Sequence, residues 1–279
     1  MFIAIVFVLG VIFGSFINAL VWRLHEQSKL KKKSKKLKNS SKDELSIVKG
    51  RSMCPHCRHE LAAKDLVPVL SWLGLKGRCR YCQKPISVQY PLVELLTGLS
   101  FVAFYVWLPI NLGTYGYLLS VVFYALLVLG MALAVYDAKW FLLPNSLVYP
   151  FNSLSFLLVC TLALQADSFR KFAIAVMSGV IFYSLFRLIF EVSKGRWLGY
   201  GDVRLSLGLG LLAGTPLKVM LLLFVASMVG TIWSLPGILV RQKNINVQVP
   251  FGPFLLFGAW AVVTWGERVL NWYSNYLGV

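Results

Sequence analysis

Four cysteines occur in two pairs with the same spacing, and thiolates at this spacing can hold a metal ion. Cys54-Pro-His-Cys57 is followed, after 21 residues, by Cys79-Arg-Tyr-Cys82. Together the two pairs offer the four sulfur ligands that a tetrahedral zinc ion prefers. We predict a zinc site at Cys54, Cys57, Cys79 and Cys82, with redox dithiols or free thiols as the remaining interpretations. His56 and His59 are alternative ligands that we expect on the exposed side of the turns, and Cys160 is expected to pack within an apolar stretch.

Two aspartates stand at the ends of apolar stretches, and a pair of carboxyl groups can perform acid–base chemistry. Asp137 follows Ala132-Leu-Ala-Val-Tyr, and Asp202 completes Gly199-Tyr-Gly-Asp. Both fall where a span would meet the same side of a membrane, so they share a depth. Two close carboxyl groups in a poorly solvated site do not both ionise comfortably, which provides one acid and one base. Such a pair can activate a water and protonate a leaving amide nitrogen, which is peptide hydrolysis without a metal.

A simpler role for each aspartate is structural. Either one could cap a helix end or pair with a nearby cation, Lys139 or Arg204. If the pair is catalytic, helix dipoles would distinguish its members, because Asp137 follows a span and Asp202 precedes one. We therefore expect Asp202 to be the ionised base and Asp137 the protonated acid.

These residues lie in a chain with the composition of a helical membrane protein. Of its 279 residues, 58% are hydrophobic and 14% are charged, and the mean hydropathy is +0.70. Soluble domains carry about 25% charged residues, and disordered or disulfide-rich chains are excluded as well. A span needs about 20 apolar residues. The segments predicted to span a membrane are 2–22, 91–109, 115–136, 147–165, 170–190, 203–214, 217–240 and 253–270. We predict an all-α polytopic membrane protein of about eight transmembrane helices, with a small zinc-ribbon-like insertion after the first.

The basic residues predict how these spans are oriented. If residues 23–90 are cytoplasmic, the cytoplasmic connections contain 22 of the 28 Lys and Arg residues, and the turns 110–114 and 166–169 contain none. This asymmetry follows the positive-inside rule and places both termini outside. The chain then divides into a first transmembrane helix (1–22), a cytoplasmic basic linker with the four-cysteine zinc-binding domain (23–90) and a seven-helix membrane domain (91–279).

Of the net charge of +17, +12 lies in residues 23–90, which include the basic run Lys29-Leu-Lys-Lys-Lys-Ser-Lys-Lys-Leu-Lys38. With Asn39-Ser-Ser41 after it, this composition is typical of a disordered tether. Basic side chains near a bilayer are attracted to anionic lipid head groups by about 1 kcal/mol each. We predict a tether that contacts anionic lipid. No nucleic-acid partner is expected, because no aromatic residues are interleaved with the basic ones.

Several motifs together resemble the type IV prepilin peptidases, bifunctional leader peptidases and N-methyltransferases of the GxGD class of membrane aspartyl proteases. In chain order the motifs are Gly14-Ser-Phe-Ile-Asn18, Arg23-Leu24, Cys54-Pro-His-Cys57, Asp65-Leu-Val-Pro-Val-Leu-Ser-Trp72, Gly77-Arg-Cys-Arg-Tyr-Cys82, Tyr90-Pro-Leu-Val-Glu-Leu-Leu-Thr97, Asp137 with Leu143-Pro-Asn145, Gly199-Tyr-Gly-Asp-Val-Arg-Leu205 and Pro250-Phe-Gly-Pro253. They cover nearly the whole chain. The resemblance implies that Asp137 and Asp202 are the catalytic residues. Two features differ from the family pattern: Arg204 stands where the family usually has lysine, and residues 28–49 look like an insertion.

The resemblance also implies a location, substrates and cofactors. It implies a multi-pass protein of the bacterial inner membrane that acts on type IV pilin or pseudopilin precursors, in pilus assembly or type II secretion. The leader is then cleaved after a glycine on the cytoplasmic side, and the new N-terminal residue is methylated with S-adenosylmethionine. The four cysteines favour the methylating members of the family. No glycine-rich nucleotide motif marks the donor site, which leaves Glu94 and the segment 65–97 as candidates; Glu94 could equally be a carboxylate reaching for the membrane interface.

Two other classes of function remain open from the residues alone. A proton- or cation-coupled membrane transporter would use Asp137 and Asp202 to relay or bind its ion. A membrane-anchored adaptor would use only the zinc site. Transporters commonly have paired repeats and charges at the membrane midplane. Here the aspartates lie at span ends and no repeat is evident, so peptide hydrolysis is the main hypothesis.

Overall fold

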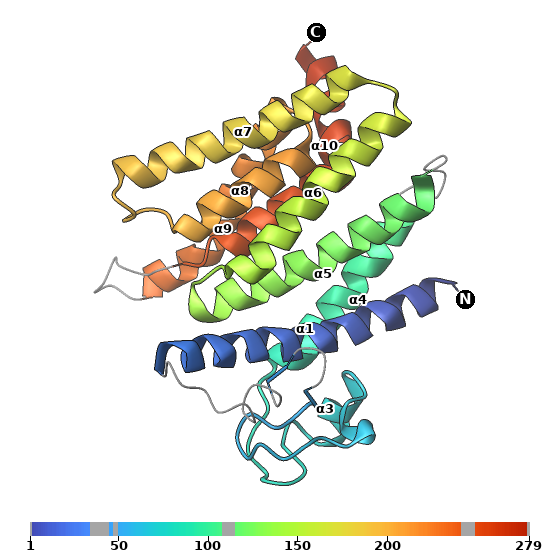
Figure 1. The fold of residues 1–279 in the computed structure, drawn as a ribbon, viewed down its shortest axis with the longest axis vertical. Helices are drawn as coiled ribbons and strands as arrows, with labels where there is room; N and C mark the ends of the chain where they lie inside the picture. Colours follow the sequence, from blue (N-terminus) through green and yellow to red (C-terminus); the bar gives the residue numbers. More distant parts are fainter. Residues whose placement is uncertain (1, 34–44, 47–49, 108–114, 241–248, 278–279) are drawn as a thin grey trace. The chain divides into compact units, whose positions relative to one another are not determined.

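The computed structural model describes residues 2–33, 45–46, 50–107, 115–240 and 249–277. These residues form helices joined by turns, and the β-type pairing among them is limited to two isolated bridges. They fall into two compact units, Met1–Val106 (unit 1) and Trp107–Val279 (unit 2), whose helices are labelled in Figure 1. Besides residues 23–90, unit 1 contains nearly all of the next long helix.

Unit 1 is built on close contact between its two long helices, α1 (Phe2–Lys33) and α4 (Gln89–Trp107). Gly10 and Gly14 lie four residues apart on α1. A Cβ at Gly14 would lie only 2.6 Å from the Cα of Glu94 on α4. Small residues at this spacing let helix backbones approach each other within a membrane. The Gly14 motif noted in the sequence therefore has a packing role.

Between α1 and α4 the chain forms turns and two short helices, η1 (Ala63–Asp65) and α3 (Leu70–Gly74), neither of which contains a buried residue. A segment without its own apolar core needs another source of stability, such as a metal. Helix α1 continues to Lys33, so the prediction of a disordered tether is wrong for the start of the Lys-rich segment. The rest of that segment, within residues 34–44, lies outside the described residues.

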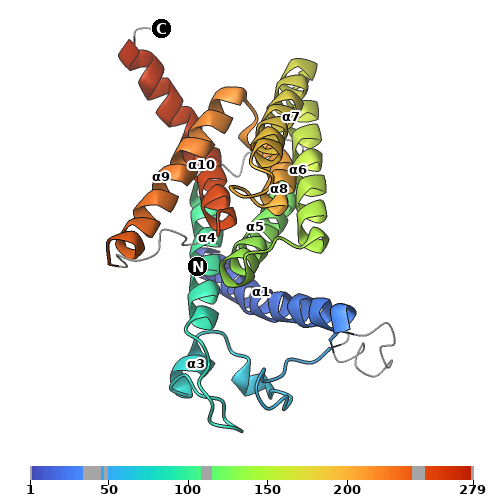
Figure 2. The ribbon, with the colours of Figure 1, turned by 90° about the vertical axis from the view of Figure 1, so that its left-hand side faces the viewer.

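In its described residues, unit 2 consists of six helices, a short central one and five others around it. They are α5 (Gly116–Trp140), α6 (Asn145–Gln165), α7 (Phe169–Val192), α8 (Tyr200–Ala213), α9 (Pro216–Val240) and α10 (Gly252–Leu277). Helix α8 packs against α6, α7, α9 and α10, and Figure 2 shows it beside α6 and α7. Its apolar side chains Val203, Leu205 and Leu209 are completely buried. A Cβ at Gly210 would lie 2.8 Å from the Cα of Gly179, so glycines also set the close approach of α8 and α7.

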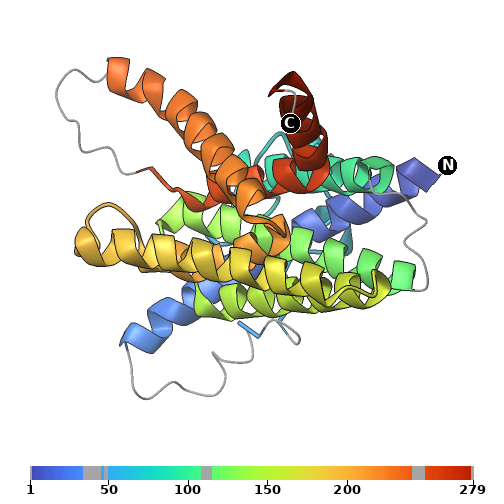
Figure 3. The same cartoon turned by 90° about the horizontal axis from the view of Figure 1, so that it is seen from above.

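The turns of unit 2 place helix ends where the aspartates lie. Helix α5 ends at Trp140, the next residue, Phe141, adopts a left-handed conformation as its C-cap, and α6 begins directly after Pro144. Proline suits this position because the first turn of a helix leaves its N–H groups unbonded in any case. Helix α10 packs against α5 as well as α8 and α9, so it links the helices that carry the two aspartates. Helix α7 lies alongside α6 and is joined to it by a short turn (Figure 3).

Helices occupy all eight segments predicted to span a membrane, as far as the structure describes them, which confirms the all-α polytopic fold. Within the part of the chain that the structure describes, six helices are long and apolar enough to cross a membrane: α1, α4, α5, α6, α7 and α9. The 14-residue α8 is too short, and α10 is not among the six. Large apolar side chains such as Val121, Met220 and Phe224 are exposed on these helices. Extensive exposed apolar surface of this kind marks contact with lipid or a partner rather than water.

Candidate functional site

The two cysteine pairs of unit 1 form two turns with the same backbone pattern, 25 residues apart in the chain. In each turn the first cysteine donates its N–H to the carbonyl five residues later and accepts an N–H from the residue four later. The partners of Cys54 are His59 at 3.0 Å and Arg58 at 2.9 Å, and those of Cys79 are Lys84 at 2.9 Å and Gln83 at 3.0 Å. Arg58 and Gln83 both have a φ of 58°, so even the left-handed residue occupies the same place. The turns are thus two copies of one local structure.

The four sulfur atoms are grouped as a tetrahedral metal site requires. All four lie within 4.8 Å of one another, and no histidine, aspartate or glutamate in the described ranges joins the cluster. The Sγ atoms of Cys54 and Cys82 are 3.9 Å apart. Zinc–sulfur bonds of about 2.3 Å in a tetrahedron put the sulfurs about 3.8 Å apart. A disulfide would require about 2.05 Å, so the residues fit a zinc ion, and His56 and His59 are not needed as ligands.

The backbone also favours negative charge on these sulfurs. The N–H groups of His56 and Cys57 face the sulfur of Cys54, and those of Tyr81 and Cys82 face the sulfur of Cys79. Burial nevertheless raises the pKa of the Cys54 thiol to about 11. Burial acts in the same direction on Cys79, but its hydrogen bonds outweigh burial and lower the pKa to about 7. A divalent cation deprotonates the thiols that coordinate it.

Two carboxylates attach the cysteine turns to the rest of unit 1. The Asp65 side chain is 2% exposed and accepts a hydrogen bond of 2.8 Å from Nε of Arg80, which lies between two of the cysteines. Burial would raise the pKa of the Asp65 carboxyl, but the hydrogen bond and the charge of Arg80 hold it below its ordinary value. Glu94 of α4 accepts a 2.7 Å hydrogen bond from the N–H of Val69. Val69 has a φ of 61°, a region that β-branched residues rarely adopt, so this bond helps to hold a strained turn.

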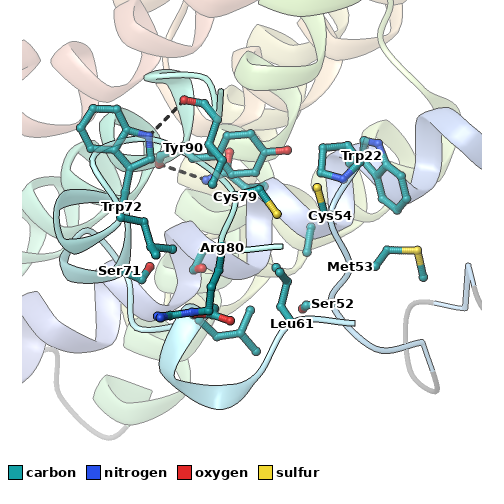
Figure 4. Close-up of a pocket in the computed structure, with 18 of the residues that line it drawn as sticks. Trp22, Ser52, Met53, Cys54, Leu61, Ser71, Trp72, Cys79, Arg80 and Tyr90 are labelled. Atoms are coloured by element: carbon teal, nitrogen blue, oxygen red, sulfur yellow. Dashed lines mark hydrogen bonds and ion pairs between the residues drawn. The ribbon is translucent and has the colours of Figure 1, made fainter. Parts of the chain in front are cut away.

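A cavity of about 140 Å³ lies inside unit 1, beside the cysteine turns (Figure 4). A single water needs about 10–15 Å³ of such space, so the cavity has room for a ligand of many atoms. Two of the four sulfurs, those of Cys54 and Cys79, belong to its wall, and so does Glu94. The cavity wall therefore contains ligands of the candidate metal site and the carboxylate that the sequence left as a candidate for the methyl donor.

In unit 2, Asp137 lies in the last turn of α5 and is 5% exposed. Its Oδ2 accepts a 3.0 Å hydrogen bond from the N–H of Gly252, the first residue of α10. A Cβ at position 252 would lie 2.7 Å from that oxygen. Only glycine lets the backbone approach the carboxylate this closely. Gly252 is thus a positioning residue for Asp137. The sequence analysis identified the motif Pro250-Phe-Gly-Pro253, but the motif gives no indication that Gly252 contacts Asp137, 115 residues away.

Asp202 lies in the first turn of α8 and is 9% exposed. It is the third residue after the helix N-cap, Gly199, and its carboxylate lies close to the N–H of that residue. This arrangement corresponds to half of a capping box. Its other oxygen, Oδ1, is buried without a hydrogen-bond partner among the described residues. The charge of Asp137 acts on Asp202, so the two carboxyl groups are electrostatically coupled.

The purely structural role considered for the aspartates, helix capping or pairing with a cation, is only partly supported by the structure. Asp202 lies in the first turn of α8 near the N–H of the N-cap residue, but neither aspartate forms an ion pair within the described ranges. Arg204 instead hydrogen-bonds Asn145 at the start of α6 and lies 4.4 Å from the ring centre of Tyr200. The nitrogen of Lys139 lies 4.9 Å from the ring centre of Trp140. Two buried, coupled carboxyl groups without cationic partners suit acid–base chemistry better than a purely structural role.

The structure also changes the expected distinction between the two aspartates. Asp202 faces the start of α8, as the sequence predicted, but Asp137 faces the start of α10 through Gly252. Both carboxylates therefore meet the positive end of a helix dipole. The dipole argument no longer assigns the acid and the base, and the two groups titrate as a coupled pair.

Two protein-family models match this chain, one in each half. Residues 8–108 match the bacterial peptidase A24 N-terminal domain, and residues 121–235 match the type IV leader peptidase family. The prepilin leader peptidase/N-methyltransferase of Aeromonas hydrophila is 33% identical over 289 residues, which cover 99% of this chain and 96% of that protein. The protein of the same name from Pseudomonas aeruginosa is 29% identical, with 99% and 95% covered. The type 4 prepilin-like proteins leader peptide-processing enzyme of Escherichia coli O78:H11 is 35% identical over 260 residues, with 91% and 90% covered. No solved structure matches the chain, and the transporter hypothesis gains no support from these relatives.

Proposed function

This chain belongs to the type IV leader peptidase family, and from that premise we propose that it removes the leader of type IV pilin or pseudopilin precursors and then methylates the new N-terminus. The cleavage site is the bond after the leader's glycine, on the cytoplasmic side of the inner membrane. The observation that carries the hydrolytic part is the pair Asp137 and Asp202, buried, coupled and without an ion-pair partner in the described ranges.

The two aspartates supply both proton transfers that peptide hydrolysis needs. The carboxylate of the pair takes a proton from water as the water oxygen bonds to the scissile carbonyl carbon. The protonated member gives its proton to the amide nitrogen as the carbon–nitrogen bond breaks. The N–H of Gly252 orients Asp137 for this exchange, and the helix start at Gly199 orients Asp202. After one turnover the proton has moved from one carboxyl group to the other.

The methyl-transfer part is supported by the names of the relatives and by unit 1. When bound, S-adenosylmethionine supplies a methyl group on a positively charged sulfur, which an amine lone pair accepts while the sulfur becomes a neutral thioether and the nitrogen loses a proton. The four cysteines would hold zinc with no open position, so the ion is structural. By fixing the two turns, the four cysteines would hold the wall of the cavity in place and would not take part in methyl transfer.

The orientation of the chain belongs to the same proposal. The excess of Lys and Arg in residues 23–90 supports a cytoplasmic unit 1 with both termini outside. The Lys-rich segment would then lie next to anionic lipid head groups, which attract basic side chains within a Debye length of about 8 Å.

The test is a cleavage and methylation assay on detergent-purified protein. The substrate is a peptide with a short basic leader, a glycine and a hydrophobic segment, and products are followed by mass. Release of the leader at the glycine, followed by a gain of one methyl group with S-adenosylmethionine, is the expected result. A protein that holds zinc and remains folded but leaves the peptide intact contradicts the proposed hydrolysis.

A further inference from the structure

The cavity of unit 1 is lined by large aromatic side chains, one of which is fixed by a hydrogen bond. Trp22 and Trp72 stand on opposite sides of the sulfur atoms in Figure 4, with Tyr90 between them. The Nε1 of Trp72 donates a 3.1 Å hydrogen bond to the carbonyl of Ile86. Aromatic faces of this kind stack on planar heterocycles and attract cations.

One polar group in the wall has an unused acceptor. Asn18 of α1 is 5% exposed, and its Nδ2 donates a 3.1 Å hydrogen bond to the carbonyl of Tyr90. This bond fixes the amide, yet its Oδ1 is buried and has no partner in the described part of the chain. A buried acceptor left unsatisfied is costly, so such groups usually accept a hydrogen bond from a water or a ligand. A donor on a ligand, such as an exocyclic amine, would satisfy it.

The wall also contains a carboxylate without a cation. Glu94 is 6% exposed and accepts the N–H of Val69, but it forms no ion pair within the described ranges. The other charged groups of the wall are engaged. Asp65 pairs with Arg80, and Arg23 donates to the carbonyls of Ser46 at 3.0 Å and Gly50 at 2.8 Å. The cavity thus offers its uncompensated negative charge to a cationic ligand.

We propose that this cavity is the binding site of S-adenosylmethionine, with Glu94 facing the positively charged part of the donor, Asn18 accepting a hydrogen bond from it and the tryptophans enclosing its heterocycle. The assignment rests on the proposed methyl transfer. It accounts for three independent features of the wall: the aromatic side chains, the orphan acceptor and the carboxylate without a cation. It also explains why two metal-site cysteines line the cavity, since the metal then fixes the shape of a ligand site.

The test compares two ligands that differ in charge at one atom. S-adenosylmethionine carries a positive sulfonium, and S-adenosylhomocysteine, which lacks the methyl group, has a neutral thioether at that place. Equilibrium binding of each to the detergent-purified full chain is measured by calorimetry, without peptide and without turnover. Glu94→Gln keeps an acceptor for the N–H of Val69 and removes only the charge. We expect about tenfold weaker binding of the sulfonium ligand and a change below about threefold for the neutral one.

A second variant and matched controls separate binding from folding. Asn18→Leu should weaken both ligands about equally, by roughly tenfold, because a hydrogen bond to either is lost. The controls are Glu60→Gln, which removes an exposed carboxylate paired with Arg51, and Asn271→Leu, at an exposed position on α10. Both should bind like the unmodified chain. Zinc content should stay unchanged in Glu94→Gln and Asn18→Leu, which shows that the cysteine turns remain folded.

The outcomes distinguish this assignment from the proposed function. If the unmodified chain binds and transfers the methyl group while Glu94→Gln and Asn18→Leu bind as it does, the cavity is not the donor site and methyl transfer stands. Equal weakening of both ligands by Glu94→Gln would also overturn the role given to its charge. If the unmodified chain binds neither ligand and transfers no methyl group, the methyltransferase part of the proposed function fails together with the site, while the cleavage assay still decides hydrolysis.

Discussion

The sulfur site of unit 1 and the carboxyl site of unit 2 are assembled in opposite ways. The sulfurs come from two copies of one local turn, each held by hydrogen bonds that span five residues or fewer. The carboxyl groups are 65 residues apart in the chain, and the group that orients Asp137 lies 115 residues away from it. The sulfur site can form within a short segment that has no apolar core, once a metal is bound. The carboxyl site forms only when the helices of unit 2 pack together. The two sites should therefore fail separately and for different reasons.

The largest effect is expected at the carboxyl site itself. Asp137→Asn or Asp202→Asn keeps the volume but removes both charge and proton exchange, so leader cleavage should fall by about 100- to 10,000-fold. Methylation of a pre-cleaved peptide should continue, because it needs no activated water. Leader release is followed by mass, with Asp167→Asn in the exposed α6–α7 turn as the control. Full cleavage by either variant would rule out the aspartyl mechanism.

The corresponding change at the sulfur site should spare cleavage. Replacing Cys54 or Cys79 by Ser removes a ligand from a kind of site whose binding free energy in zinc peptides is on the order of 10 kcal/mol, so the turns should loosen. Metal content measured by mass spectrometry should drop, and methyl incorporation should drop with it. Cys160→Ser, outside the cluster, is the matched control. Normal methylation by metal-free protein would contradict the structural role of the four cysteines.

A smaller change can weaken the carboxyl site without touching either aspartate. Gly252→Ala would put a methyl group 2.7 Å from Oδ2 of Asp137, so the carboxylate or the start of α10 must move. A displacement of about 1 Å can cost roughly 100-fold in rate, and we expect a loss of about 10- to 100-fold in kcat. Gly74→Ala, where a Cβ would meet nothing within 4 Å, should behave as the unmodified chain. An unchanged kcat for Gly252→Ala would mean that this hydrogen bond does not orient the catalytic pair.

The ion pair that attaches the second cysteine turn should have a modest and pH-independent effect near neutrality. Arg80 is 43% exposed, so Asp65→Asn should lower stability by about 1 kcal/mol or less. Because the folded pKa of Asp65 lies below its ordinary value, the stabilisation is fully present above the unfolded pKa of about 3.9 and is lost only as the pH falls through the folded value. The difference in thermal midpoint between the two proteins should thus be constant from about pH 7 to about pH 5. A difference that shrinks within that range would contradict the assignment.

The smallest effect is expected from the Lys-rich segment. Replacing Lys29 to Lys38 with Gly and Ser of equal length should change cleavage by less than a few-fold, since the attraction of each basic side chain to lipid is weak and is screened by salt. Cleavage is compared at low and physiological salt in anionic vesicles. A cleavage rate about a hundredfold lower at physiological salt would mean that the segment binds substrate directly. The molecule would then have a third functional site besides the sulfur and carboxyl sites.

The same contrast explains what the sequence could and could not predict. The cysteine spacing predicted the sulfur cluster because each of the two turns that form it consists of consecutive residues. Apolar run lengths predicted the helices for a similar reason. The partners of Asp137 and Asp202 were not predictable, because the N–H of Gly252 reaches Asp137 only through the packing of α10 on α5. The unsatisfied acceptor of Asn18 could not be predicted from the sequence either, since the bond that orients this amide joins α1 to Tyr90 of α4.

The two copies of the cysteine turn differ in one respect, which is the depth of their members. The first cysteine of each turn, Cys54 or Cys79, is buried at the cavity wall, whereas Cys57 is exposed and Cys82 is partly so. The cluster therefore has an inner and an outer edge. Chelators, oxidants and exchanging metal ions reach the outer pair of sulfurs first, and the inner pair last. Oxidation or loss of metal would then begin at the outer sulfurs and change the shape of the cavity through Cys54 and Cys79. The aspartates of unit 2 contain no sulfur, so neither change would affect them directly.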